Sequence, residues 1–390
     1  MARTAAVIGA GMVGTTSALA LQRAGFVVTL YDPMRVPSGA SWGNAGHLAI
    51  EQVEPWASWP AIKSAPARLF ARGGALDFPL RDIGAWLPFS LRLLAAAGRF
   101  EAGRAALSSL LAQAAGAWRA LVADVGAPDL LREIGHFVIW ESDTSAARGL
   151  AAWNTTGTGT ASFRLAAGDE LERIAALMKR PPAGAIRFRG TGQIADPTRL
   201  ATTLAQAFEA RGGKRIYESV DGLSQVDADI VLVAAGARSA KLIPAPLIAE
   251  RGYHIMSEAH DWPTDLGPLV FDDRSMIITP FESGIRWSSF LEFGRPDSPA
   301  DPRKWQRLRA HAEDIGLPVD LPGKPWMGAR PTLPDYLPAI GRRGSNLLYA
   351  FGHQHLGLTL SPITAEIVAA LASGARPPVP VEPFDLKRFG

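Results

Sequence analysis

The stretch AAVIGAGMVGTTSALALQRAGFVVTLYD, residues 5–32, decides the fold of the amino-terminal region. Its short apolar run leads into Gly9, Gly11 and Gly14, which have the spacing G-x-G-x-x-G. We expect Gly9 to permit a tight turn, Gly11 to let the backbone approach a pyrophosphate, and Gly14 to let a helix pack against the strand. The Ala- and Leu-rich segment that follows predicts this helix, and residues 27–31 predict a second strand.

A carboxylate at the end of the second strand completes the pattern. Asp32 can accept hydrogen bonds from ribose hydroxyls, while the helix N-terminus offers N–H groups and a positive dipole end to a pyrophosphate. Strand, glycine loop, helix, strand and acid follow one another within about 30 residues, as the dinucleotide fingerprint requires. The pattern therefore predicts a parallel α/β domain that binds a dinucleotide, and it leaves NAD and FAD as alternatives.

Composition places the chain among ordinary folded proteins. Its 390 residues predict two domains, and 47% hydrophobic with 20% charged residues is typical of a packed globular chain. The net charge is +3 and no run of Lys or Arg indicates a nucleic-acid partner. The chain has no cysteine, which excludes disulfides, thiolate metal ligands and a flavin attached through sulfur. It enters a strand at once, so we expect no signal peptide and a cytoplasmic location.

The α/β patterns occur at the start, middle and end of the chain, with antiparallel patterns between them. We predict an α/β fold with a discontinuous nucleotide-binding domain made of residues 1–50, 185–245 and 330–390. Residues 51–184 and 246–329 are expected to form an α+β substrate domain with a mainly antiparallel sheet.

Individual elements are predicted from periodicity and turn residues. The expected helices and strands lie at 101–125, 134–140, 196–211, 347–351 and 361–373, the last helix being closed by Gly374. A hairpin over 269–293 turns at Glu282-Ser283-Gly284. Because side chains alternate along a strand, only one of Arg286 and Trp287 can face a ligand.

The most apolar segment is IGAWLPFSLRLLAAAG at residues 83–98. It contains Pro88 and Arg92 and is shorter than the roughly 18–20 residues of a membrane span. We expect a helix whose apolar face is buried or meets a partner. A helix lying on a membrane surface is the alternative.

Further motifs follow along nearly the whole chain: GASWGNAGHLA at 39–49, VLVAAGARS at 231–239, ERGYH at 250–254, ITPFESGIRW at 278–287, MGARPTLPDYLPAIG at 327–341 and FGHQHLGLT at 351–359. With these motifs the chain resembles the FAD-dependent D-amino-acid oxidase and dehydrogenase superfamily, and most of all its bacterial D-amino-acid dehydrogenase branch. The motifs that begin at residues 250 and 327 are similar to the subgroup that oxidises D-proline or cis-4-hydroxy-D-proline.

The resemblance implies a Rossmann-like domain that holds FAD in an extended pose. It implies that the ADP half is held by Gly9, Gly11, Gly14 and Asp32, and that the flavin ring is lined by Ser41, Asn44, Ala45, Gly46 and His47. Ala235 and Gly236 would pass close to the dinucleotide. The pyrimidine edge of the flavin would lie along Gly352, Gly357, Leu358 and Thr359. Some relatives attach FAD to a histidine in the segment that matches 41–46. Trp42-Gly43 stands in that segment here, so we expect tightly bound, non-covalent FAD.

The resemblance also implies hydride transfer from the α-carbon of an amino acid to flavin N5. The substrate carboxylate then needs a fixed cation, and a guanidinium matches two oxygens at once. Arg330 is the first candidate, and pairing of Arg330 with a structural acid such as Asp335 is the alternative. Tyr253 and His254 are the next candidates, for the carboxylate and for the ring or amine of an imino acid, with packing equally open.

The remaining histidines give weaker signals. His353 and His355 lack a clear third ligand, so we predict no metal site and expect them to line the flavin pocket. His136 and His260 lie in no motif and are expected to be structural.

Three other functions stay open. An NAD-dependent dehydrogenase would explain residues 5–32 but not GHQHLGLT near the C-terminus. A non-catalytic nucleotide-binding scaffold and a glycine or sarcosine oxidase that uses oxygen are the others. The expected partners are a small amino or imino acid and an electron acceptor, for which oxygen, a quinone and a partner subunit are equally open. Residues 83–98 add a possible peripheral contact with the inner face of a membrane or with a partner.

Overall fold

The computed structural model describes residues 2–36, 39–258, 262–263 and 265–390, so His260 lies outside the described residues. One sheet has the strand order β10-β2-β1-β11-β18-β17. Its strands are β1 (Thr4–Ile8), β2 (Val27–Tyr31), β10 (Lys214–Ile216), β11 (Ile230–Val233), β17 (Ala339–Arg343) and β18 (Leu347–Phe351). Neighbouring strands are parallel except β17 and β18, which pair antiparallel.

A second, mainly antiparallel sheet has the order β16-β12-β15-β14-β13-β6-β8-β7, and β4 pairs with β15. Its strands are β4 (Leu76–Asp77), β6 (His136–Trp140), β7 (Ser162–Leu165), β8 (Gly184–Arg189), β12 (Ile248–Ser257), β13 (Leu269–Phe271), β14 (Met276–Phe281), β15 (Gly284–Gly294) and β16 (Lys324–Thr332). A small sheet joins β3 (His47–Leu48), β9 (Gly192–Ile194) and β5 (Leu131–Arg132).

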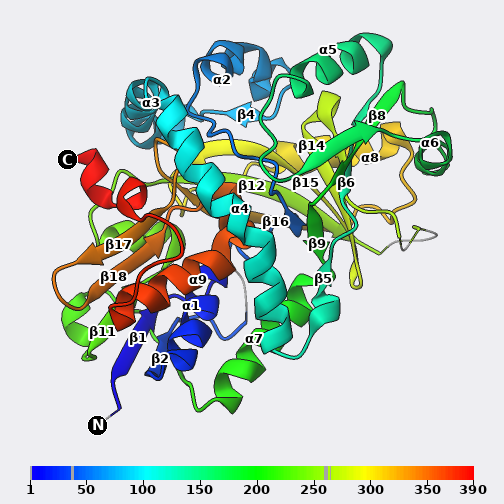
Figure 1. Cartoon of the computed structure of the whole chain (residues 1–390). Helices are drawn as coiled ribbons and strands as arrows, with labels where there is room; N and C mark the ends of the chain where they lie inside the picture. The colour runs from blue at the N-terminus through cyan, green and yellow to red at the C-terminus, as the bar shows by residue number, and fades with distance from the viewer. Residues whose placement is uncertain (1, 37–38, 259–261, 264) are drawn as a thin grey trace.

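Helices flank both large sheets (Figure 1). Their bounds are α1 (Met12–Arg23), α2 (Trp59–Ser64), α3 (Ile83–Ala97), α4 (Phe100–Asp124), α5 (Asp143–Trp153), α6 (Gly168–Ala175), α7 (Pro197–Ala210), α8 (Pro302–Ile315) and α9 (Gly357–Ser373). The long helix α4, cyan in Figure 1, runs past the orange-red α9, which in turn packs on α1.

The glycine loop positions α1 against the parallel sheet. Gly9 has φ of +108°, a value that favours glycine, and a side chain there would meet the carbonyl of Ala234 at 2.5 Å. A Cβ on Gly14 would lie 1.8 Å from the carbonyl oxygen of Gly9. Both glycines are therefore required by the close approach of β1, α1 and the strand β11, as the sequence predicts.

The last helix begins four residues earlier than expected, at Gly357 instead of residue 361, although it ends at Gly374 as predicted. Pro362 lies inside the helix and cannot donate to the carbonyl of Leu358. The indole of Trp118 donates to that carbonyl at 3.2 Å and the hydroxyl of Ser361 donates to it at 3.0 Å. Because Trp118 of α4 supplies a donor for the carbonyl of Leu358, α9 tolerates Pro362. The helix can therefore begin at Gly357, before the expected start.

Two segments differ from the expected division of the chain. The apolar face of α4 packs on α9 through residues such as Leu110 and Leu121, although residues 51–184 were expected in the substrate domain. Strand β8 pairs with β6 and β7 in the second sheet, although residues 185–245 were expected in the nucleotide-binding domain. Both segments bury apolar surface against partners that are remote in sequence.

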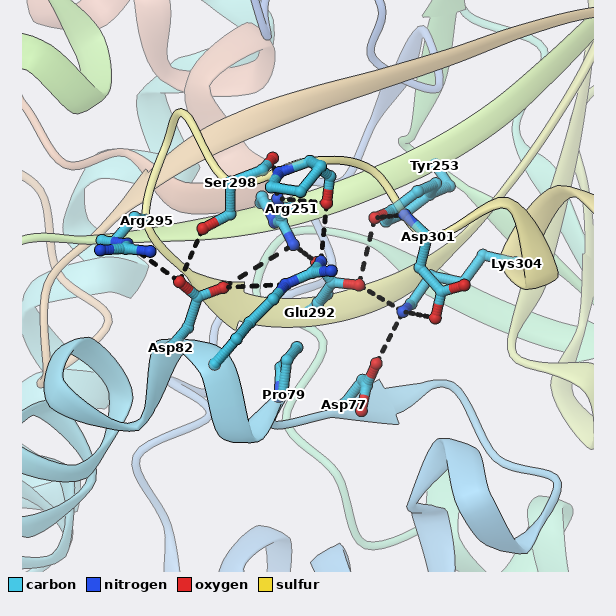
Figure 2. Close-up of polar contacts among 12 residues, drawn as sticks. Asp77, Pro79, Asp82, Arg251, Tyr253, Glu292, Arg295, Ser298, Asp301 and Lys304 are labelled. Carbon is cyan, nitrogen blue, oxygen red and sulfur yellow. Dashed lines mark hydrogen bonds and ion pairs between the residues drawn. The ribbon is translucent and has the colours of Figure 1, made fainter.

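A buried charged cluster ties the second sheet to β4 and α8 (Figure 2). The ammonium of Lys304, which is fully buried, lies 2.6 Å from Asp77 and also binds Glu292 and Asp301. Glu292 is fully buried too, and it pairs with Arg251. The ammonium of Lys304 contacts all three acids Asp77, Glu292 and Asp301, so a cation already lies in a group whose spacing would suit a metal ion.

We expect Lys304→Met to lower the free energy of unfolding by about 3–5 kcal/mol, because it leaves buried carboxylates without their cation. Urea unfolding of the FAD-loaded protein measures this change. Arg303→Met is the matched control: that side chain is 70% exposed and pairs with Asp301, and its loss should cost at most about 1 kcal/mol. Equal destabilisation by both variants would contradict a special role for the buried ammonium.

One helix in the described chain, Gln354–Ser373, is long and apolar enough to cross a membrane. Of its most apolar window, 67% is buried inside the protein, as in a core helix.

Candidate active site

A cavity of about 710 Å³ extends along the ends of the parallel strands and under β16. Its walls come from the glycine loop and the end of β2, residues 39–44, the segment after β11, β16 and the start of α9. Ligands of open α/β sheets bind at the carboxyl ends of the strands, and this volume lies in the range of ligand-binding cavities. Segments that are far apart in sequence thus form one elongated site.

The structure brings together twelve of the residues proposed from the sequence. Those that line this cavity are Gly9, Gly11, Asp32, Ser41, Asn44, Ala235, Gly236, Arg330, His353, His355, Gly357 and Leu358. Ala45 and Tyr253 line only a small neighbouring cavity of about 20 Å³. Gly14, Gly46, His47, His254, Gly352 and Thr359 line neither cavity.

The glycine loop and Asp32 form a pre-organised end of the site. The Ala10 N–H donates to Asp32 Oδ2 at 2.7 Å, and the Met34 N–H donates to Oδ1 at 2.9 Å. The Met12 N–H, at the start of α1, donates to Ser41 Oγ at 3.0 Å. Backbone N–H groups, a carboxylate and a hydroxyl therefore converge where the fingerprint places a pyrophosphate and a ribose.

Several of the other residues support the cavity wall instead of lining it. Gly46 and Gly352 have φ of +68° and +78°, so they serve tight turns. Thr359 is buried, and its hydroxyl accepts the Ala49 N–H at 3.0 Å. Together they hold the segment that follows residue 44 against the start of α9.

Arg330 is held on the cavity wall by an acid that the sequence analysis did not consider. Its Nη1 donates to Glu250 Oε1 at 3.1 Å, and the hydroxyl of Tyr336 donates to Glu250 Oε2 at 3.0 Å. Glu250 is fully buried, whereas the Arg330 side chain is 25% exposed. The alternative acid, Asp335, pairs with Arg388 instead.

Gly252 makes room for this guanidinium. A Cβ at Gly252 would lie 2.2 Å from Arg330 Nη2. Opposite Gly252 the β12–β15 register shifts, and Phe290 in β15 has φ of +71°. This irregularity is a β-bulge, a feature that often re-aims side chains beside functional sites.

Tyr253 does not fit the carboxylate role. Its hydroxyl donates to Glu292 at 3.1 Å and accepts the Asp301 N–H at 3.1 Å, within the buried charged cluster (Figure 2). Neighbouring side chains of a strand point to opposite faces, so Tyr253 and His254 cannot both face the cavity side of β12. Tyr253 takes the face of Arg251, away from Arg330.

His254 supports the cavity wall instead of facing a substrate. Its Nδ1 donates to the carbonyl of Gly43 at 2.9 Å, and its ring stacks on Trp326 with centroids 4.7 Å apart. Burial, followed by the charge of Arg286, lowers the pKa of His254 to about 3, so the ring is neutral. His254 therefore holds the 41–46 segment in place.

Arg286, not Trp287, takes the face toward that segment. Its guanidinium donates to the carbonyl of Asn44 at 2.5 Å and lies 4.9 Å from the Phe281 ring centroid. Burial lowers the pKa of Arg286 to about 10. Trp287 is fully buried in the core on the other face of the sheet, so the alternation of side chains separates the two residues as expected.

His47 points into a buried polar group and not toward the cavity. Its Nε2 lies 3.3 Å from Glu51 Oε1, and its ring contacts His136 with centroids 4.4 Å apart. Burial opposes ionisation of Glu51, but the imidazoles of His47 and His136 outweigh it, and the pKa of Glu51 falls to about 2. The ligand atoms of His47, Glu51 and His136 lie within 4.8 Å of one another, a spacing that could hold a metal ion. Within the described chain, neither His353 nor His355 belongs to a group of potential ligands with such a spacing.

His355 brings an unused polar atom to the cavity. It lines the cavity, and its Nε2 is buried without a hydrogen-bond partner among the described residues. Burial lowers the pKa of His355 to about 3, and the charge of Arg330 adds to this effect. A neutral imidazole with a free nitrogen is thus available to a bound molecule, whereas His353 bonds to Thr364 at 3.0 Å.

Buried histidines predict that stability falls in acid. Burial lowers the pKa from 6.5 to about 3 in His136, His254, His353 and His355 and to about 4 in His311. Between these values the unfolded chain binds protons that the folded chain excludes, so the free energy of unfolding decreases as pH falls from about 6.5.

Urea unfolding of the FAD-loaded protein at about pH 7.5 and about pH 5 checks this prediction. Each such histidine contributes up to about 1.4 kcal/mol per pH unit. His353→Gln should reduce the pH slope by roughly one histidine's share. Equal stability at both pH values would show that these rings are protonated in the folded state.

Comparisons with known proteins agree with this geometry. Residues 4–371 match the family described as FAD dependent oxidoreductase (DAO). The chain is 32% identical over 422 aligned positions to a D-amino-acid oxidase from Bradyrhizobium diazoefficiens, with 99% of each chain covered.

The chain belongs to this family of FAD-dependent oxidoreductases. A D-amino acid dehydrogenase from Dechloromonas aromatica is 28% identical, over 95% of this chain and 97% of the relative. Among solved structures, glycine oxidase from Geobacillus kaustophilus has a TM-score of 0.71 at 20% identity, with 99% of both chains covered. Iminodiacetate oxidase from Chelativorans sp. BNC1 has a TM-score of 0.68 at 18% identity, with 98% of both covered. These similarities confirm the predicted fold class.

FAD is the cofactor of this family, which decides between the two dinucleotides left open by the fingerprint. The cavity of the oxidoreductase fits that group. The Gly9–Met12 loop and Asp32 suit the ADP half, and a Cβ at Gly236 would project into open space within the cavity wall. Arg238 and Lys241 add cationic side chains along the same wall.

Two site residues were missed by sequence reasoning. Glu250 stands in the quoted ERGYH motif, but only the β12–β16 register, Glu250 opposite Arg330, reveals its role. Tyr336 stands in the quoted MGARPTLPDYLPAIG motif, and with a φ of +57° its hydroxyl reaches Glu250. The sequence did offer one signal for Glu250: an acid in a buried strand needs a hydrogen-bonding or charged partner, and no partner was predicted for it.

Proposed function

We propose that this enzyme oxidises a D-amino acid, or a cyclic imino acid such as D-proline or hydroxy-D-proline, at the α-carbon. The observation that carries the proposal is the guanidinium of Arg330 on the wall of the FAD cavity, held by the buried carboxylate of Glu250. A fixed guanidinium suits the two oxygens of a substrate carboxylate. The names of the relatives, D-amino-acid oxidase and D-amino acid dehydrogenase, support the same substrate class.

The cofactor, when bound, supplies the acceptor for a hydride from the α-carbon, and the resulting imine hydrolyses or cyclises. Arg330 binds and orients the carboxylate. Glu250 holds the guanidinium through Nη1, and the buried hydroxyl of Tyr336 fixes the carboxylate of Glu250 in turn. Burial and the neighbouring Glu250 raise the pKa of Tyr336 well above its ordinary value, so its hydroxyl stays protonated and donates.

Two features favour hydride transfer from a substrate whose amine is neutral. The neutral ring of His355 brings no positive charge of its own, and its free Nε2 can accept a hydrogen bond from the amine. The N-terminus of α9 presents its positive dipole end at Gly357 and Leu358, which line the cavity. The N–H groups of this N-terminus would stabilise negative charge on FAD bound in the cavity.

Anaerobic mixing of the FAD-loaded protein with a panel of D- and L-amino acids that includes D-proline tests the proposal. We expect flavin bleaching with one or more D-amino or imino acids, followed by reoxidation with either oxygen or a quinone dye. Bleaching by glycine or sarcosine, with hydrogen peroxide release in air, would favour the glycine oxidase alternative. A flavin that no amine bleaches would favour a non-catalytic scaffold.

Non-covalent attachment of FAD is part of the proposal. Segment 41–46 holds no histidine, the chain has no cysteine, and His47 pairs with Glu51 outside the cavity lining. Acid precipitation should leave the yellow colour in the supernatant. A yellow pellet would show a covalent bond.

A further inference from the structure

The face of α3 that points away from the protein is apolar. Five of the eleven large hydrophobic side chains that are exposed in the described chain belong to residues 80–94. Their exposed fractions are 81% for Leu80, 45% for Ile83, 44% for Leu87, 60% for Leu91 and 39% for Leu94. Leu80 directly precedes α3, and the spacing of three or four residues places the other four along one side of the helix.

The opposite face of α3 holds the helix on the protein. Phe89 is buried and lies 5.7 Å from the Phe293 ring, and Trp86 donates its indole N–H to the Pro79 carbonyl at 2.9 Å. In Figure 1, α3 lies at the edge of the molecule. Burial, the first sequence-based expectation for this segment, thus holds for the face that carries Phe89. The outward face has no partner within the described chain, so its contact with a partner or a membrane stays a prediction.

The exposed charges along this segment are of one sign. Arg81, Arg92 and Arg99 are exposed, and Arg81 also pairs with the buried carboxylates of Asp82 and Glu292. The single acid between residues 80 and 99, Asp82, is 1% exposed and is hydrogen-bonded to Ser298 at 2.6 Å and to Arg295 at 3.1 Å. An apolar stripe with cations and no exposed acid is complementary to an anionic phospholipid surface.

We propose that the exposed face of α3 docks on anionic phospholipid membranes. A second copy of this chain fits the face less well, because a symmetric contact would bring arginines against arginines. The stripe is also small for a protein partner: a helix of 15 residues is about 22 Å long, and one face of it is far below the roughly 800 Å² per partner of a stable interface.

This surface is connected to the FAD cavity. Asp82, at the start of α3, binds Arg295 and Ser298 (Figure 2). Pro296 and Asp297, between these two partners, line the cavity. Docking would thus engage a helix whose start is hydrogen-bonded to a loop of the cavity wall, although docking itself requires no particular substrate or acceptor.

Co-sedimentation of the FAD-loaded protein with vesicles tests the proposal. We expect binding to phosphatidylcholine vesicles that contain about one third phosphatidylglycerol, weaker binding to pure phosphatidylcholine, and release by salt. Leu91→Asp should reduce binding at least about tenfold, and Arg92→Glu at least about fivefold. Leu165→Asp is the matched control, because Leu165 is 63% exposed on β7, outside this face, and it should bind like the unmodified protein.

Flavin absorbance and activity with a soluble dye should be unchanged in all three variants. Unchanged absorbance shows that the variants fold and hold FAD, and unchanged activity shows that docking is tested independently of the proposed substrate. Wild-type protein that stays in solution with both vesicle types would overturn the proposal, as would a Leu91→Asp variant that binds like wild type. A dimer that Leu91→Asp dissociates, without vesicle binding, would assign the face to a second copy instead.

Discussion

Replacing Arg330 by lysine is expected to lower kcat/KM about 10- to 100-fold, mainly through a higher KM, with FAD still bound. Lysine keeps the positive charge but cannot match two carboxylate oxygens with a planar fork, and hydrogen bonds to charged groups contribute roughly 1.5–3 kcal/mol each. Arg330→Met removes the charge as well and should cost about 100-fold or more. Steady-state kinetics on whichever amino acid bleaches the flavin measures both variants.

Arg330→Met should also lower the stability of the fold, because Glu250 is left buried without its cation. The double variant Arg330→Met/Glu250→Gln removes that charge, so it should regain stability but not substrate affinity. Arg343→Lys is the matched control, since Arg343 is exposed and lies outside the cavity lining. An unchanged KM in Arg330→Lys would remove Arg330 from the substrate site.

Gly14→Ala is expected to destabilise the protein by about 3 kcal/mol or more and to abolish FAD binding. The added Cβ would lie 1.8 Å from the carbonyl oxygen of Gly9. That oxygen belongs to the backbone and the Cβ is attached directly to the helix backbone, so neither atom can shift cheaply. Relief of the clash must move α1 away from β1, which displaces the loop that lines the ADP end of the cavity. Urea unfolding and flavin content after gel filtration measure the two effects.

Gly116→Ala provides the matched control for this substitution. Gly116 also lies inside a helix, α4, but a Cβ there would have no heavy atom within 4 Å. The change should stabilise the protein by roughly 0.5–1 kcal/mol, because alanine is the better helix former. Normal FAD content in Gly14→Ala would contradict the close-packing explanation of the fingerprint glycine.

The features that the sequence predicted well depend on neighbours in the chain. The β1–α1–β2 unit follows from a glycine spacing and a hydrophobic period, both of which operate within a few residues. Helix α7 begins after Asp196, whose carboxylate accepts the N–H groups of Thr198 and Arg199, as the cap residue predicts. Strand β18 has the predicted bounds, 347–351, because its short apolar run is also a local pattern.

The features that the sequence did not predict depend on register and on which face a side chain takes. Tyr253 and His254 were proposed together, yet strand alternation sends them to opposite sides of β12. The direction of His47 depends on Glu51 and His136, of which the second is 89 residues away in the chain. No local pattern carries that information.

The sequence by itself thus determined the family, the FAD-binding fingerprint and the arginine that lines the cavity, because these follow from local sterics and ordered motifs. The tertiary structure alone decided that Glu250 holds Arg330, since the two residues meet across strands paired 80 positions apart. It also decided that one side of α3 faces outward, because burial depends on what the rest of the chain places against a helix, and periodicity marks an apolar face without saying what covers it.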